Sequence, residues 1–266
     1  MPHESARRTI LQALFRAGAV LRRRFGKVKV SVKSRANLLT EADLESQRTI
    51  LSIIRRRFPG HDVLAEEGRS DLKGAEFLWI VDPLDGTTNY AHGFPAFTVS
   101  IGLLRRGEPV LAGVYDPMRD ECFTAEKGKG GSINGKPLKV SRTAKLSEAL
   151  LITGFPYDRA GRSAYYTRFY AAFLEICHDI RRSGSAALDM AWVAAGRADG
   201  FWEFGLSPWD AAAGLLLIRE AGGEVTDFQG EAWKAAEAYG RQTLATNGRI
   251  HAAMRKVIGR RLRGRV

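Results

Sequence analysis

The sequence is poor in the side chains that build disulfide scaffolds and soft-metal sites. Its 266 residues include only two cysteines, Cys122 and Cys177, and five histidines. Two thiols alone supply neither a disulfide framework nor a zinc spacing, which excludes small disulfide-rich folds. Because so few cysteines fit a reducing compartment, we expect a cytoplasmic protein.

Long apolar runs are missing as well. No stretch approaches the roughly 18 consecutive apolar residues that a membrane helix needs, so no membrane partner is expected. Arg16 interrupts the apolar segment near the start of the chain, which argues against a secretory signal. With 45% apolar and 26% charged residues, the composition is ordinary for a globular protein that can bury a large core.

The net charge of +12 is concentrated at the two ends of the chain. Residues 1–35 carry ten Lys or Arg against one Glu, and residues 249–266 carry seven against none. The body between them has 24 basic and 28 acidic residues and is mildly acidic. Basic ends can contact RNA or another polyanion, whereas charge runs are more often solvated helix faces, and both interpretations stay open here.

Apolar periodicity predicts a layered α/β protein. Helices are expected at 5–25, 41–57, 163–178, 185–196, 208–221 and 248–260. Strands are expected at 77–82, 97–104, 109–115, 121–126, 149–154, 200–204, 223–227 and 243–246. Asn134-Gly135 predicts a tight hairpin. We expect one module over 1–266, with subdomains of about 1–145 and 146–266.

The segment WIVDPLDGTTNY, residues 79–90, combines two carboxylates with a glycine and two hydroxyls. The apolar run before it predicts a strand that ends at Asp82, and Pro83 stiffens the turn that follows. Asp82 and Asp85 can then converge on one point, while Gly86 lets the backbone approach a ligand. The two threonines suit a helix start, which binds anions. The pattern predicts a metal-assisted phosphate site, although Asp-Pro-x-Asp-Gly is also an ordinary turn composition.

Two more acidic positions favour the metal interpretation. Glu66 lies in DVLAEEG, and Asp210 lies at the start of an apolar helix in WDAAAGLLLIREAGG. A carboxylate at a helix start can simply cap the helix dipole, or it can bind a cation that compensates its burial. All candidate donors are oxygens, so Mg²⁺ or Mn²⁺ is favoured over zinc.

DPLDGTTN at 82–89, together with WDAAAGLLLIREAGG at 209–223, resembles the two signature segments of the inositol monophosphatase family. The resemblance extends from Lys33 to the terminal helix. It implies an αβαβα five-layer sandwich of the inositol monophosphatase and fructose bisphosphatase type. It also implies two to three Mg²⁺ per site with Mn²⁺ as a substitute, inhibition by lithium, and a homodimer.

The resemblance also implies a role for individual residues. The ligands of the first metal match Glu66, Asp82 and the Leu84 carbonyl. Those of the second metal match Asp82, Asp85 and Asp210. Glu66 also matches the carboxylate that binds a weaker third ion. Thr87 and Asp43 match the pair that activates the water, and Gly86 and Thr87 match the phosphate-binding residues. The residues that match the substrate-binding wall are Gly184, Ser185, Ala186 and Glu203, together with Asp85 and Asp210. Lys33 matches a lysine of an entrance loop.

The ligand set favours hydrolysis of a phosphomonoester through direct in-line attack of a metal-activated water. The resemblance implies that the substrate is inositol 1-phosphate. Alternatives within the superfamily are fructose-1,6-bisphosphatase, histidinol-phosphate phosphatase and nucleotide 2′/3′-phosphatase. Arg159 and Arg162 could contact a second phosphate, or they could belong to a solvated loop. A hypothesis of another class is a protein that binds RNA or a transcription complex through its basic termini.

Overall fold

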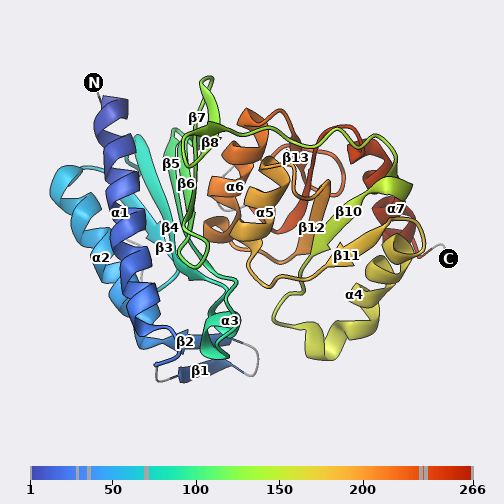
Figure 1. Cartoon of the computed structure of the whole chain (residues 1–266), viewed down its shortest axis with the longest axis horizontal. Helices are drawn as coiled ribbons and strands as arrows, with labels where there is room; N and C mark the ends of the chain where they lie inside the picture. Colours follow the sequence, from blue (N-terminus) through green and yellow to red (C-terminus); the bar gives the residue numbers. More distant parts are fainter. Residues whose placement is uncertain are drawn as a thin grey trace.

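A computed structural model of the chain describes residues 2–27, 30–34, 37–68, 72–233, 236 and 239–264. Two β-sheets alternate with three layers of helices (Figure 1). From left to right in the figure, helices α1 (Pro2–Arg24) and α2 (Glu41–Arg57) cover the first sheet, and α5 (Ala186–Ala194) and α6 (Pro208–Glu220) lie between the sheets. Helices α4 (Arg159–Leu174) and α7 (His251–Leu262) cover the second sheet, which completes the expected αβαβα sandwich.

The seven-stranded sheet takes all its strands from residues 62–137, in the order β3-β4-β5-β6-β7-β8-β9. Its strands are β3 (Asp62–Ala65), β4 (Phe77–Asp85), β5 (Thr98–Arg105), β6 (Glu108–Asp116), β7 (Glu121–Glu126), β8 (Gly130–Ile133) and β9 (Lys136–Pro137). Only β3 runs parallel to its neighbour β4, and the other pairs are antiparallel. Helices cover both faces, so β5 and β6 are buried along almost their whole length.

The five-stranded sheet takes its strands from residues 150–246, in the order β11-β10-β12-β14-β13. These are β10 (Leu150–Thr153), β11 (Asp179–Arg181), β12 (Gly200–Phe204), β13 (Glu224–Thr226) and β14 (Gln242–Thr246). Strand β10 is parallel to both of its neighbours, whereas β14 is antiparallel to both of its own. The division of the chain into subdomains near residue 145 stays a prediction.

Helix α6 is apolar nearly all round because it lies in the central layer. Its small residues allow it to approach α5 closely: a β-carbon added at Gly214 would lie 2.6 Å from the β-carbon of Met190. This packing places the start of α6 against the first sheet, where the Trp209 carbonyl accepts a hydrogen bond from Ser100 of β5 at 3.3 Å.

Most expected elements are present, with differences at their ends. The expected helix at 163–178 begins at Arg159 and ends at Leu174, and the terminal helix runs over His251–Leu262. The short strands β3 and β11, the hairpin β1 (Val30–Ser34) with β2 (Asn37–Thr40), helix α3 (Thr87–Ala91) and the 3-10 turn η1 (Leu146–Glu148) were not predicted as elements. The hairpin at Asn134-Gly135 is confirmed between β8 and β9, with φ of +47° and +80° at its two turn residues.

None of the helices in the described ranges combines the length and apolar character required to cross a bilayer.

Candidate active site

A bulge in strand β4 brings Asp82 and Asp85 together. The sequence predicted that this strand ends at Asp82, but strand β4 continues to Asp85. Asp82 pairs with Ser100 and Asp85 with Thr98, so β4 advances three residues while β5 advances two. Residues three apart on a regular strand face opposite sides of the sheet, and the one extra residue restores both carboxylates to one side.

Side-chain hydrogen bonds hold this bulge in place. The Leu84 amide donates to Asp82 Oδ1 at 2.9 Å, and the Ser46 hydroxyl of α2 donates to the Pro83 carbonyl at 2.7 Å. Gly86 follows with φ of +98°, and a β-carbon there would lie 2.9 Å from the Ala96 carbonyl oxygen. Glycine is therefore required both by the backbone conformation and by the lack of space.

Asp210 reaches the same point from the start of α6. Asp82, Asp85 and Asp210 each offer a carboxylate oxygen within 4.8 Å of the others. The Ser207 amide donates to Asp210 Oδ2 at 2.7 Å, which makes Asp210 part of a capping box. The capping and ligand interpretations of Asp210 are thus compatible, because one oxygen caps the helix while the carboxyl group also reaches the cluster.

Asp85 is held by the start of α5. Its Oδ2 accepts hydrogen bonds from the Ser185 hydroxyl at 2.6 Å and from the Ala187 amide at 2.7 Å. A helix N-terminus stabilises negative charge, so this contact keeps Asp85 oriented and opposes the effect of burial. The same oxygen is occupied by these donors, which leaves Oδ1 as the better-placed atom for a cation.

Burial and mutual repulsion raise the pKa values of these carboxyl groups. Burial raises the pKa of Asp82 well above its usual value, and Glu66, Asp85 and Asp210 raise it further. Burial, followed by the charge of Asp85, raises the pKa of Asp210 to about 7. Glu66 directly follows β3, where its amide donates to the Val81 carbonyl at 3.2 Å. Carboxylate oxygens that converge in this way form a donor set that fits a hard divalent cation.

Thr87 and Asp43 lie beside this cluster. The Thr87 hydroxyl lies 3.2 Å from Asp43 Oδ1 and 3.1 Å from the Leu84 carbonyl oxygen. The Thr40 amide and hydroxyl donate to Asp43 Oδ2 at 2.8 and 2.5 Å, in the capping box of α2. Burial raises the pKa of Asp43 despite these donors. Asp43 and Thr87 belong to motifs that are far apart in the chain, and the fold places both residues beside the candidate metal ligands.

A cavity of about 500 Å³ opens over the acidic cluster. Among the predicted residues, its walls include Glu66, Asp85, Gly86, Thr87, Gly184, Ala186, Glu203 and Asp210. Ser185 does not line this cavity: it is 1% exposed, and its hydroxyl is directed to Asp85. The structure therefore places Ser185 behind the wall that was predicted to contact substrate hydroxyls. The side chain of Lys33 lies outside the described residues, so its entrance-loop role stays a prediction.

Glu203 of β12 lies deep in the cavity wall, 8% exposed. Its carboxyl group covers Gly154, where an added β-carbon would lie 2.2 Å from Oε2. Burial raises the pKa of Glu203 well above its usual value, and the charges of Asp189 and Asp210 add to this effect. A glycine at 154 is what allows this carboxyl group to fit, and its role toward substrate stays a prediction.

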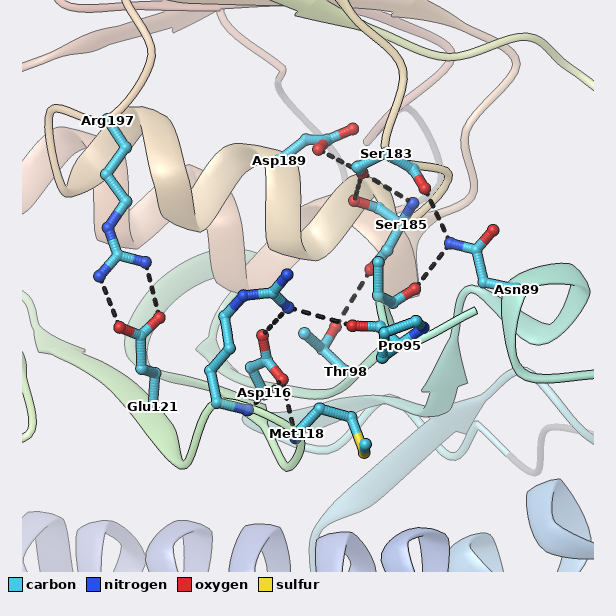
Figure 2. A network of polar contacts seen from close by, with 12 residues as sticks. Asn89, Pro95, Thr98, Asp116, Met118, Glu121, Ser183, Ser185, Asp189 and Arg197 are labelled. Atoms are coloured by element: carbon cyan, nitrogen blue, oxygen red, sulfur yellow. Dashed lines mark hydrogen bonds and ion pairs between the residues drawn. The ribbon is translucent and has the colours of Figure 1, made fainter. Parts of the chain in front are cut away.

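Sequence reasoning missed Asn89, which connects the two halves of the site (Figure 2). Its Nδ2 donates to the Ala96 carbonyl at 2.7 Å and to the Ser183 carbonyl at 2.8 Å. The Ser183 hydroxyl in turn lies 3.2 Å from the Ser185 amide, and Ser185 binds Asp85. The asparagine that ends DGTTN was the available signal, but only the fold shows which carbonyls it reaches.

Tyr157 and Arg182 were also missed, and both line the cavity. Tyr157 is 55% exposed by surface area, yet its pKa is raised by desolvation and then by the carboxylates Asp210 and Glu66. Tyr157 is therefore an exposed part of the cavity wall rather than part of the core. In the sequence, GFPYDR offered no periodicity that distinguished it from an ordinary loop.

Comparison with known proteins agrees with this geometry. Residues 3–263 match the model of the inositol monophosphatase family. An inositol-1-monophosphatase of Synechocystis is 43% identical over 250 residues, covering 93% of this chain and 86% of the relative. The Nus factor SuhB of Pseudomonas aeruginosa is 44% identical over 228 residues, covering 83% of this chain and 84% of the relative.

A solved inositol monophosphatase structure from Anabaena superimposes with a TM-score of 0.87 at 44% identity. The match covers 98% of this chain and 97% of that one. Sequence, fold and acidic cluster therefore lead to the same conclusion: the chain belongs to the inositol monophosphatase family, whose members are metal-dependent phosphatases.

Proposed function

We propose that the protein is a Mg²⁺-dependent phosphomonoesterase that hydrolyses inositol 1-phosphate. The observation that carries the proposal is the convergence of Asp82, Asp85 and Asp210 within 4.8 Å at a cavity large enough for a small phosphorylated polyol. Carboxylates alone repel a phosphate ester. The cluster is useful to such a substrate only when cations compensate its charge.

Two to three ions are proposed to bind to Glu66, Asp82, Asp85, Asp210 and the Leu84 carbonyl. Bound there, Mg²⁺ or Mn²⁺ would supply positive charge to the phosphate oxygens and to the attacking water. The hydrogen bonds to one oxygen of Asp85 and of Asp210 keep both groups oriented before any ion binds. Lithium inhibition belongs to the same proposal.

Thr87 and Asp43 are proposed to align the water that attacks the phosphorus. The Thr87 hydroxyl and Asp43 Oδ1 are 3.2 Å apart, so one water can contact both. Asp43 is suited to accept a proton from that water, because burial raises its pKa above that of an exposed aspartate. The backbone amides of Gly86 and Thr87 are proposed to bind the phosphate.

The rest of the cavity is proposed to receive the polyol. Glu203 lies in the wall, and its high pKa favours a carboxyl group that can both donate to and accept from a ring hydroxyl. Gly184 and Ala186 line the adjacent wall and leave room for a ring. Asp85 and Asp210 border the same space.

The test is a panel of purified phosphomonoesters, assayed with Mg²⁺ and again with excess chelator. Hydrolysis of inositol 1-phosphate that is lost with chelator and restored by Mg²⁺ supports the proposal. Much faster hydrolysis of fructose 1,6-bisphosphate, histidinol phosphate or a nucleotide 2′- or 3′-phosphate would assign the corresponding alternative. Equal rates with and without chelator would contradict the metal-dependent mechanism.

Binding to RNA or to a transcription complex is the second candidate function. It is favoured by the name of the Pseudomonas relative and by the exposed Arg255, Lys256 and Arg260 on α7. Neutralising these residues together with Arg261 and Arg263 should remove salt-dependent RNA binding and leave phosphatase activity unchanged. Arg265, which belongs to the same basic end, lies outside the described residues. Binding that is absent, or insensitive to salt, would remove this candidate.

The homodimer implied by the family resemblance and the cytoplasmic location also remain proposals. Light scattering at several concentrations measures the first, and fractionation of cells that express the protein measures the second. A monomer at all concentrations would contradict the dimer.

A further inference from the structure

One side chain of α2 binds both backbone groups of Glu67. Gln47 donates from Nε2 to the Glu67 carbonyl at 2.6 Å, and its Oε1 accepts from the Glu67 amide at 3.1 Å. Glutamine suits this contact because its amide carries a donor and an acceptor side by side, whereas a glutamate in its place would lack the donor.

This pair of hydrogen bonds lies where a strand of the first sheet ends. Strand β3 ends at Ala65 and pairs with β4, and among the described residues no strand pairs with its other side. Gln47 therefore supplies the two hydrogen bonds that a neighbouring strand would exchange with Glu67. Gly68 follows with φ of +96°, so the chain leaves the extended conformation directly after this contact.

The segment held in this way carries a proposed metal ligand. Glu66 lines the cavity, and its charge raises the pKa of Asp82 in the acidic cluster. The Glu66 amide donates to the Val81 carbonyl at 3.2 Å. The backbone that carries the Glu66 carboxylate is thus fixed by β4 at Glu66 itself and by Gln47 at the next residue.

Gln47 shares a face of α2 with two other residues that contact the site. Asp43, Ser46 and Gln47 are spaced by three and four positions, which places them on one face of the helix. Asp43 lies 3.2 Å from the Thr87 hydroxyl, and Ser46 donates to the Pro83 carbonyl at 2.7 Å. The same helix face therefore supports the proposed water-aligning pair, the bulge of β4 and the segment after β3.

We propose that Gln47 is a positioning residue for Mg²⁺ binding: by fixing the backbone of Glu67, it holds the Glu66 carboxylate toward the acidic cluster. The inference rests on the proposed metal-dependent function. A backbone that is already fixed loses less conformational entropy when an ion binds. Groups that orient a metal ligand typically change metal affinity by about tenfold to a hundredfold.

A double-mutant cycle with Mg²⁺ as the titrant tests this role. Gln47→Met removes both hydrogen bonds and keeps the length and helix propensity of the side chain. Glu66→Gln removes the carboxylate and shows which part of Mg²⁺ binding depends on it. Titration calorimetry without substrate measures Mg²⁺ affinity for the wild type, both single variants and the double variant, and circular dichroism checks that each is folded.

Asn134→Gly is the matched control. Asn134, in the turn between β8 and β9, also binds the backbone through both atoms of its amide: Oδ1 accepts from the Cys122 amide at 2.8 Å, and Nδ2 donates to the Asp120 carbonyl at 2.9 Å. Strand β9 lies at the opposite end of the strand order from β3. Glycine tolerates the φ of +47° at this position, so the control removes the same kind of contact far from Glu66.

We expect Gln47→Met to weaken Mg²⁺ binding about tenfold when Glu66 is present and to have no further effect in the Glu66→Gln background. Asn134→Gly should leave Mg²⁺ affinity unchanged. In the metal-free protein, hydrogen exchange followed by NMR should show a protected Glu67 amide in the wild type and faster exchange in Gln47→Met, because the N–H loses this acceptor.

Unchanged Mg²⁺ affinity in Gln47→Met would overturn the role, and so would an unprotected Glu67 amide in the metal-free wild type, which needs no variant. Equal weakening by Gln47→Met and Asn134→Gly, or an equal effect of Gln47→Met with and without the Glu66 carboxylate, would show a general effect on the fold and overturn it as well. In these outcomes the wild type still binds Mg²⁺ and the proposed function stands. A wild type that does not bind Mg²⁺ would contradict the proposed function itself.

Discussion

The seven-stranded sheet and the central helices hold the candidate metal ligands in different ways. The seven-stranded sheet presents Asp82 and Asp85 from a bulge in a buried strand, where β5 pairs with both residues and β3 pairs with β4 only as far as Val81. The central helices present Asp210 from a helix start and hold Asp85 through the start of α5. The strand fixes the position of its ligands through the backbone, whereas the helices orient theirs through caps. The site exists only where both meet.

The largest effect is expected on the strand side. Asp82→Asn should lower kcat/KM about 10²- to 10³-fold, or roughly 3–4 kcal/mol, because it removes a charge from the centre of the cluster. Steady-state kinetics at saturating Mg²⁺ measure the loss. Glu175→Gln, which changes an exposed acid after α4, serves as the control and should have no effect. Near-normal turnover of the Asp82 variant would show that the strand does not supply the essential ligand.

On the helix side, Ser185→Ala tests whether the cap of α5 orients Asp85. The variant removes the hydroxyl that donates to Asp85 Oδ2 at 2.6 Å. Mg²⁺ affinity should fall about tenfold or more, as is typical for groups that support a metal ligand. Titration calorimetry measures it. Ser132→Ala removes a comparable hydroxyl contact, between Ser132 of β8 and Thr124 of β7, and should leave Mg²⁺ affinity unchanged.

The raised pKa of Asp210 makes Mg²⁺ affinity depend on pH. Because this pKa is raised to about 7, the cation must displace a proton below that pH. Mg²⁺ affinity should therefore rise with pH, by up to about tenfold per unit below pH 7, and level off above it. Calorimetry from pH 5.5 to 8.5 measures the slope, and Asp210→Asn should reduce it. A flat profile for the wild type would contradict the shift.

The same shift affects the metal-free protein in the opposite direction. A carboxyl group whose pKa is higher in the folded than in the unfolded state favours folding when protonated. The contribution of Asp210 is thus fully present below its ordinary pKa of about 4 and is lost as the pH rises through about 7. Thermal unfolding with chelator should show the wild type losing more stability than Asp210→Asn over this range.

The smallest effect is expected at the connection between the halves. Asn89→Asp loses both Nδ2 donors and places a carboxylate against the Ala96 and Ser183 carbonyl oxygens. We expect a loss of about 1–2 kcal/mol in unfolding free energy and weaker Mg²⁺ binding. Denaturant unfolding and calorimetry measure the two quantities.

Asn134→Asp is the matched control, because Asn134, in the turn between β8 and β9, donates from Nδ2 to the Asp120 carbonyl at 2.9 Å. It should lower stability without changing Mg²⁺ affinity. If both variants weaken Mg²⁺ binding equally, Asn89 has no special role in joining the two halves.

The sequence predicted which residues form the site more fully than it predicted how those residues are arranged. Apolar runs located β4 and α6, and the acidic residues beside them marked the ligand candidates. The bulge was not predictable, since Pro83 suggested a strand end and pairing with β5 decides that β4 continues. The burial of Ser185 was equally hidden: its motif placed it at the cavity wall, but its hydroxyl is committed to Asp85.

The sequence by itself determined most of the longer elements, the oxygen-rich donor set and the family, because periodicity and residue chemistry are local properties. Tertiary structure alone decided which carboxylates meet and which of them lose solvent. The physical reason is that burial and charge interactions depend on distances between residues up to 128 positions apart, as with Asp82 and Asp210. The bulge in β4 and the packing of α5 and α6 between the two sheets set those distances.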